Sequence, residues 1–341
     1  MFTRNRIYPV LLIILVFIVW KIRQNANKVE RVAFNGQTMG TFYNIIYLHP
    51  DGTVFKKEVD SLLVEWNKSL STYISDSEIS NFNRNSYLTF QSPYFYPVLL
   101  KSREIYEATE GAFDPTIMPL VNAWGFGPED RELPDSMEVS KLKKLVNFRL
   151  IEFDSIRIRK KISGVQLDFS AIAKGYGVDV VGEYLESKGI KNYLVEIGGE
   201  ITCRGINDKG TPWTTGIEDP NVQLNDRKIM AVIEVSNKAI ATSGNYRNYY
   251  IKDGQKYAHT INPHTGFPVQ HSLLSATVIA DDCMTADGFA TAFMVLGIDS
   301  SIQIVNDHPE LDAFFIYNDD MGQLTTYMTE GFKNVLKKDD G

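Results

Sequence analysis

A carboxylate and a hydroxyl stand four residues apart in an apolar segment, at Asp287 and Thr291. On a helix, residues i and i+4 share a face, so both side chains would present oxygen atoms in one direction. Oxygen ligands of this kind suit Mg²⁺, which proteins usually hold with one or two carboxylates and complete with substrate phosphate and water. The same spacing also fits a helix whose first turn is simply acidic.

A second candidate site is the segment DFSAIAKGYGVD, which begins at Asp168. A β-rich run ends at Asp168, and Ser170 is expected to cap a following helix. Helix N-termini expose N–H groups and partial positive charge, so they hold anions such as phosphate, and Lys174 adds a full charge one turn in. Asp168 could accept hydrogen bonds from a polar ring or a ribose. An ordinary strand-to-helix junction with a solvated lysine has the same pattern.

Two histidines, His259 and His264, stand in a loop rich in turn residues. Histidine is the usual general base near neutral pH, so either could activate a hydroxyl. A zinc site would need a third ligand, for which His271 and Cys283 are the candidates. A histidine in a loop more often has a structural role than a catalytic one.

Glycine and aromatic residues gather in several short motifs. Tyr73 and Trp124 could stack on a flat ring, and the neighbouring glycines allow a backbone to approach a ligand closely. None of these motifs matches G-x-G-x-x-G or a Walker A loop, so a Rossmann or P-loop nucleotide site is disfavoured.

The elements that must position these groups follow a mixed order rather than strict βαβ alternation, which favours an α+β fold. Apolar spacing and turn residues predict helices over 54–70, 93–109, 170–187 and 285–296. They predict strands over 40–48, 150–153, 156–158, 165–169, 193–197, 213–218, 228–235, 246–252, 273–280 and 314–317.

Composition excludes several classes of protein. The 341 residues include 44% hydrophobic residues, which is ordinary globular usage and excludes a disordered chain or a coiled-coil rod. The net charge of −7 argues against a nucleic-acid partner, which would need clustered Lys and Arg. Cys203 and Cys283 are the only cysteines, too few for a disulfide scaffold; they could pair, but we expect two buried free thiols.

An uncharged apolar run from Ile7 to Trp20 lies between basic residues. This pattern is typical of a signal peptide or membrane anchor over residues 1–23, followed by a polar linker over 24–31. At ~1.5 Å per residue the run spans about 21 Å, so snorkelling basic flanks would have to complete a ~30 Å hydrocarbon core. No small-x-small cleavage site follows directly, which favours an uncleaved anchor over a cleaved signal.

Taken in order, the motifs resemble those of the ApbE family, the FAD:protein FMN transferases. The resemblance runs from about Gln37 to Gly297. It rests on MGT at 39–41, LSTY at 70–73, GAFDPT at 111–116, WGFG at 124–127, DFSAIAKGYGVD at 168–179, EIGGEI at 196–201, ATSGNYRNYY at 241–250, YAHTINPHTGFP at 257–268 and TADGFATAFMVLG at 285–297. Because no second linker interrupts the chain, we expect one mixed α/β flavin transferase domain over 32–338.

The resemblance implies a Mg²⁺-dependent reaction. FAD binds, its FMN half moves onto a Thr or Ser hydroxyl of a target flavoprotein through a phosphoester bond, and AMP leaves. The metal would be held by the main-chain oxygen at Ala171, the carboxylate of Asp287 and the hydroxyl of Thr291. The usual targets of the family include membrane redox-pump subunits, which suits a domain anchored to the bacterial inner membrane and facing the periplasm.

Other roles follow from positions that match the family's motifs. Contacts to FAD are implied for Met39, Tyr73, Ala112, Phe113, Asp114, Asp168, Lys174, His259 and Ile261. His259 matches the histidine of the family's Y-x-H block and is the candidate base for the acceptor hydroxyl. Asp287 is the competing candidate, but a metal-bound carboxylate is a poor base.

Two other functions remain open at the level of the sequence. A Mg²⁺-dependent FAD pyrophosphatase would use the same site with water as acceptor, but hydrolytic relatives differ at the position of Tyr73. A non-catalytic FAD-binding protein would need neither the Asp287–Thr291 pair nor His259. The chain also lacks the lipobox cysteine of lipoprotein relatives, which leaves the anchoring mode to the apolar run.

Overall fold

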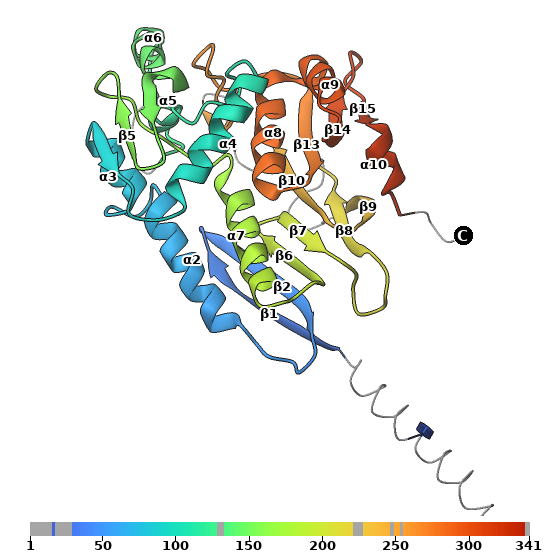
Figure 1. Ribbon diagram of the computed structural model, residues 1–341. Helices are drawn as coiled ribbons and strands as arrows, with labels where there is room; N and C mark the ends of the chain where they lie inside the picture. The colour runs from blue at the N-terminus through green and yellow to red at the C-terminus, as the bar shows by residue number, and fades with distance from the viewer. Residues whose placement is uncertain are drawn as a thin grey trace, which may run out of the picture.

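Alternating apolar residues build the central sheet of the protein. In β2 (Thr41–His49), Tyr43, Ile45 and Tyr47 are fully buried on one face, as the two-residue period of a strand requires. The computed structural model describes residues 16–17, 29–127, 133–220, 228–245, 249–252 and 255–337. Within them the sheet has the order β1-β2-β6-β7-β10-β13-β14-β15, and all its neighbouring strands are antiparallel (Figure 1).

The other strands of this sheet are β1 (Glu30–Thr38), β6 (Tyr193–Ile197), β7 (Glu200–Arg204), β10 (Lys238–Gly244), β13 (Leu273–Ala280), β14 (Asp312–Asn318) and β15 (Leu324–Met328). Smaller sheets contain β3 (Tyr87–Thr89), β4 (Ile151–Phe153) and β5 (Arg157–Lys160), then β8 (Trp213–Glu218) with β9 (Ile229–Val235), and β11 (Tyr249–Lys252) with β12 (Gln255–Ala258). The helices are α2 (Lys56–Leu70), α3 (Glu78–Arg84), α4 (Phe95–Ala108), α5 (Met118–Ala123), α6 (Ser136–Leu142), α7 (Ala173–Ser187), α8 (Cys283–Leu296), α9 (Ile298–Asp307) and α10 (Glu330–Asn334).

Both faces of the sheet are covered. Helices α7 and α8 pack against one face, with α2 and α4 beside them (Figure 1). On the opposite face, Trp213 and Ile233 of the β8–β9 hairpin and Phe332 of α10 join a second core with Ile240 of β10. The middle strands are therefore buried on both sides, and the burial pattern of β13 is almost continuous rather than alternating.

Asp179 joins α7 to the beginning of α8. Its two carboxylate oxygens accept hydrogen bonds from the N–H groups of Cys283 (2.9 Å) and Met284 (2.8 Å). These donors belong to the first turn of α8, where a helix has no internal acceptors for them. Burial raises the pKa of the Asp179 carboxyl to about 8. This one side chain therefore fixes how the two helices meet at the sheet.

Most predicted elements are present, with ends shifted by a few residues. The predicted strand over 165–169 is wrong: within this described segment only Gln166 forms an isolated bridge, to Ile117. The predicted cap is also wrong, because the Ser170 hydroxyl donates to Asp168 and α7 begins later, after Ile172, without a side-chain cap.

Both cysteines lie in the hydrophobic core. Cys203 and Cys283 are buried free thiols, as expected.

The predicted membrane segment falls almost wholly outside the described residues: of the run 7–20 they include Val16 and Phe17. Within the described residues no helix is long and apolar enough to cross a membrane. Strand β1 begins at Glu30, inside the segment expected as a linker.

Replacing Asp179 with alanine should destabilise the fold. The variant Asp179→Ala leaves the N–H groups of Cys283 and Met284 without acceptors, so we expect the free energy of unfolding to fall by about 2–4 kcal/mol. Urea denaturation followed by circular dichroism measures this. The exposed Asp320 offers a control, since Asp320→Ala removes the same group and should change little. Equal stabilities of the two variants would contradict the assigned role.

Candidate functional site

The N–H of Gly175, in the first turn of α7, has no acceptor inside its own helix, because the first N–H groups of a helix lack internal partners. It donates to Oδ2 of Asp287 on α8, over 2.9 Å. The carbonyl oxygen of Ala171, just before the helix begins, accepts no hydrogen bond from the described residues. A main-chain oxygen without a described partner therefore precedes the helix that holds the carboxylate of α8.

Asp287 and Thr291 supply further oxygens on the same side of α8. Asp287 is 2% exposed, and its second oxygen, Oδ1, has no hydrogen-bond partner within the described ranges. Burial raises the pKa of this carboxyl, although the charge of Lys174 opposes the rise. One turn on, the Thr291 hydroxyl lies 3.1 Å from that of Ser243 on β10. The predicted helical face is therefore confirmed.

These donors are chemically suited to Mg²⁺. The carbonyl of Ala171, Oδ1 of Asp287 and the hydroxyl of Thr291 are all hard oxygen ligands. The described part of the chain contains no cluster of three or more His, Cys, Asp or Glu side chains, so a cation here would depend on the main chain and the hydroxyl as well. The free carbonyl and the free carboxylate oxygen fit that requirement.

Glycines allow α8 to approach two other helices closely, α7 at Gly175 and α4 at Gly288. A Cβ at Gly175 would lie 2.3 Å from the carbonyl oxygen of Cys283 and 2.7 Å from Cβ of Asp287. A Cβ at Gly288 would lie 2.4 Å from Cδ1 of Ile105. Any larger side chain at position 175 would push the carboxylate away from α7.

Lys174 brings positive charge to the same place. Its ammonium forms an ion pair with Glu200, the first residue of β7, whose side chain is 3% exposed. Burial alone would lower the pKa of Lys174, but the charges of Asp287 and Glu200 outweigh it and raise that pKa above its usual value. Burial raises the pKa of Glu200 to about 7, against the opposing charge of Lys174. The lysine therefore pairs with Glu200 and is also attracted by the charge of Asp287.

Two tight hairpin turns flank this cluster. Met39 and Gly40 connect β1 to β2 with φ angles of 52° and 70°, and Gly198 and Gly199 connect β6 to β7 with φ angles of 63° and 107°. Two-residue hairpins favour turns with positive φ, which glycine adopts without strain. A Cβ at Gly198 would lie 3.3 Å from Cδ of Lys174. The second turn therefore lies against the lysine.

Met39 lies close to α7, because a Cβ at Gly177 would be 2.4 Å from its Cε atom. Asn67, near the end of α2, contacts the same turn, because its Nδ2 donates to the hydroxyl of Thr38 over 3.0 Å. Tyr73 follows the end of α2 and is 73% exposed, so it is accessible to a flat ligand. The structure therefore places Met39 against α7, the helix of Lys174, and Tyr73 on the surface after α2.

A third group contains Asp168 and the segment 112–114. The N–H of Asp168 donates to the carbonyl of Pro115 over 2.8 Å, which places the two segments side by side. The Asp114 carboxylate accepts from the N–H and hydroxyl of Thr116 and from the N–H of Phe148. Burial raises the pKa of Asp114 to about 6. Asp114 thus holds its own loop, together with the buried Ala112 and Phe113, against residue 148.

His259 and Ile261 lie in a separate group around Trp124. Ile261 is 4% exposed and packs in a small core with Leu120 and Trp124. The Trp124 indole N–H donates to the carbonyl of Gly266 over 2.8 Å, so the 259–268 loop is fixed against α5. His259 lies beside Phe126, with ring centroids 6.5 Å apart. His264, in contrast, is exposed.

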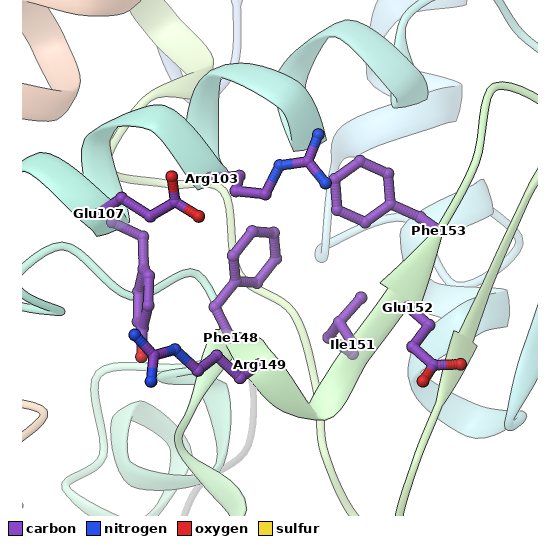
Figure 2. Close-up of a pocket in the computed structure, with 8 residues that line it drawn as sticks. Arg103, Glu107, Phe148, Arg149, Ile151, Glu152 and Phe153 are labelled. Carbon is purple, nitrogen blue, oxygen red and sulfur yellow. The ribbon is translucent and has the colours of Figure 1, made fainter.

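A distinct groove lies away from these residues. It has a volume of about 250 Å³ between α4 and the 148–153 segment, where Arg103, Glu107 and Arg149 surround the ring of Phe148 (Figure 2). None of the predicted site residues lines it. Its connection to the site is indirect, through the hydrogen bond from the Phe148 N–H to Asp114.

No sequence motif predicts a role for Glu200, Ser243 or Asp179. Glu200 pairs with Lys174, and Ser243 contacts Thr291. Asp179 accepts from the first turn of α8, the helix that carries Asp287 and Thr291. The position of Glu200 offers a signal, because a charged residue that follows a Gly-Gly turn and begins an apolar strand must find a buried partner.

Known proteins match this chain over most of its length. The model of the ApbE family matches residues 39–315. A FAD:protein FMN transferase of Vibrio cholerae is 41% identical over 320 residues, covering 91% of this chain and 94% of that protein. One from Escherichia coli is 32% identical, covering 90% of each chain.

Solved structures match as well. The flavin transferase ApbE from Vibrio cholerae aligns with a TM-score of 0.82 and 38% identity, covering 91% of this chain and 100% of that one. The flavinyl transferase ApbE of Pseudomonas stutzeri, in its apo form, aligns with a TM-score of 0.80 and 35% identity, covering 90% and 96%. The predicted mixed α/β fold is therefore confirmed.

The contact between α7 and α8 can be tested at Gly175. In Gly175→Ala the added methyl would overlap the carbonyl of Cys283, so we expect a loss of about 1–3 kcal/mol in the free energy of unfolding. Chemical denaturation measures it. Ser187→Ala, at the exposed end of the same helix, is the control and should cost little. If Gly175→Ala is as stable as the control, the close helix contact is wrongly assigned.

Proposed function

The chain belongs to the ApbE family, and we propose that it is a Mg²⁺-dependent FAD:protein FMN transferase. In the proposed reaction a Thr or Ser hydroxyl of an acceptor flavoprotein attacks the phosphorus of the FMN half. A new phosphoester bond forms, the bond to the AMP phosphate breaks, and the hydroxyl proton passes to a base. The curated relatives named as FAD:protein FMN transferases support this assignment.

The observation that carries the metal dependence is the free carbonyl of Ala171. Oδ1 of Asp287, whose Oδ2 accepts from Gly175, also has no hydrogen-bond partner among the described residues. Ala171, Asp287 and Thr291 would therefore hold Mg²⁺, which would supply positive charge to offset the negative charge of a pyrophosphate and its leaving phosphate. The protein's own contribution is to hold α8 against the first turn of α7 through the contact at Gly175.

Lys174 and the turns beside it are arranged for an anionic ligand. The lysine is held at the beginning of α7 by its pair with Glu200, and the N-terminus of α7 adds partial positive charge. The pyrophosphate of FAD is an anion of this kind. Met39, Tyr73 and Asp168, on surrounding segments, would orient the two ring systems and the sugar. Positioning and electrostatics would then provide most of the catalysis.

His259 is the proposed base. Its loop is fixed by the hydrogen bond between Trp124 and Gly266, so the ring is carried on a defined element rather than a free segment. Asp287 is the weaker candidate because it is committed to Gly175 and, in this proposal, to the metal. A neutral imidazole could accept the acceptor's proton near pH 7.

The place of action is part of the same proposal. We infer that residues 32–338 form one catalytic unit behind an N-terminal anchor, facing the periplasm of a bacterial inner membrane. The apolar run with basic flanks supports the anchor. A membrane redox-pump subunit is then the proposed class of acceptor, since such a protein presents its hydroxyl at the same surface.

Loss of the metal carboxylate should abolish transfer. When Asp287→Asn is incubated with an acceptor flavoprotein, FAD and Mg²⁺, mass spectrometry should show no FMN adduct, while the native protein forms it only with Mg²⁺ present. Native protein that releases AMP and FMN rapidly without an acceptor would indicate a FAD pyrophosphatase instead. Tight FAD binding with no adduct and no AMP would indicate a storage protein.

His259→Ala should lower transfer at least ~100-fold while FAD binding persists, because removal of a general base affects the chemical step. Single-turnover adduct formation measures the rate, and flavin fluorescence titration measures binding. His264→Ala, in the same loop, should keep near-native activity. If His259→Ala transfers FMN at the native rate, another group is the base.

A further inference from the structure

We propose that Glu200 is a positioning residue: it holds the Lys174 ammonium away from Asp287 and so keeps that carboxylate available to a divalent cation. This inference rests on the metal site of the proposed function. It adds a role for a residue that neither the ligand set nor the flavin contacts include. Without Glu200, Lys174 would itself neutralise the metal carboxylate.

Glu200 is buried and incompletely paired. Its side chain is 3% exposed, one oxygen is paired with Lys174, and the other, Oε2, is buried with no hydrogen-bond partner among the described residues. A buried carboxylate with an unsatisfied oxygen is unfavourable for folding. Such a group is more readily explained by a functional role than by stability, for which a glutamine or an apolar residue would serve.

The position of Glu200 in its hairpin also restrains Lys174. Glu200 is the first residue of β7, directly after the Gly198–Gly199 turn, and lies opposite Ile197 of β6 in the strand register. Cδ of Lys174 lies against Gly198, so the turn and the ion pair hold the lysine side chain from two sides. The lysine is thus drawn toward the sheet, whereas Asp287 lies on α8.

Lys174 also pairs with only one of its two neighbouring carboxylates. It is attracted by both Asp287 and Glu200, yet among the described residues its ion-pair partner within 4.0 Å is Glu200. With Glu200 as its partner, the ammonium does not pair directly with Asp287. If Glu200 is replaced by a neutral residue, Asp287 is the carboxylate left for Lys174, and a divalent cation must then displace an ammonium to bind.

A simpler role would be that Glu200 merely orients Lys174 for the ligand's phosphate. The two roles differ in what they predict for the metal alone. Orientation for phosphate leaves the binding of a free cation unchanged, whereas competition for Asp287 changes it in the absence of FAD. The competition also disappears once the lysine is removed, which gives a double-variant test.

The experiment measures Mn²⁺ alone, by electron paramagnetic resonance of the free ion, on the purified full-length protein without FAD. Glu200→Gln should weaken Mn²⁺ binding by about tenfold, as is typical when a residue behind a metal ligand is altered. Glu200→Asp keeps the charge and should stay closer to the native affinity. In the Lys174→Met background no ammonium competes for Asp287, so the further change Glu200→Gln should weaken Mn²⁺ binding much less than it does in the native background.

Each outcome decides the proposal. It is overturned if Glu200→Gln binds Mn²⁺ as tightly as the native protein, or if Glu200→Gln weakens binding as much in the Lys174→Met background as in the native one. If Glu200→Gln alone fails to fold, the double variant, in which residues 174 and 200 are both neutral, can still be compared with Lys174→Met for its Mn²⁺ affinity. If native protein and Asp287→Asn bind Mn²⁺ equally, the metal site of the proposed function is absent and this role falls with it.

Discussion

The hydrogen bond from the Gly175 N–H to Asp287 is the interaction on which the site depends. It gives an unpaired donor of the first turn of α7 an acceptor and fixes the carboxylate of α8 against that turn. The helices can approach this closely because residue 175 has no side chain: a Cβ there would lie 2.3 Å from the carbonyl oxygen of Cys283. The capping of one helix and the packing of two helices therefore depend on the same contact.

The contact between α7 and α8 leaves charged side chains buried beside it. Asp287 is buried between two helices, and Lys174, which is itself paired with Glu200, offsets part of its charge. Asp179 is a second buried carboxylate, outside the proposed catalytic site, and it accepts hydrogen bonds from the first N–H groups of α8. The loops that carry Asp114 and His259 are fixed by bonds to other loops, so the two parts of the site are held by different means.

The sequence predicted the parts of the fold that depend on local pattern. Helices α2, α4, α7 and α8 and strand β13 follow apolar spacing, and the shared face of Asp287 and Thr291 follows from helix geometry. It could not predict the bond between Gly175 and Asp287 or the pair between Lys174 and Glu200, because both join segments that are distant in the chain. The strand expected over 165–169 failed because that segment packs its apolar residues without a neighbouring strand to pair with.

Anomalous diffraction from crystals soaked in Mn²⁺ tests the account most directly. A single strong peak should lie about 2.0–2.3 Å from the carbonyl oxygen of Ala171, Oδ1 of Asp287 and the hydroxyl of Thr291. The Gly175 N–H should still point at Oδ2 of Asp287. A crystal in which Gly175 donates to Ala171 instead, or in which Mn²⁺ binds elsewhere while these oxygens stay empty, would contradict the account.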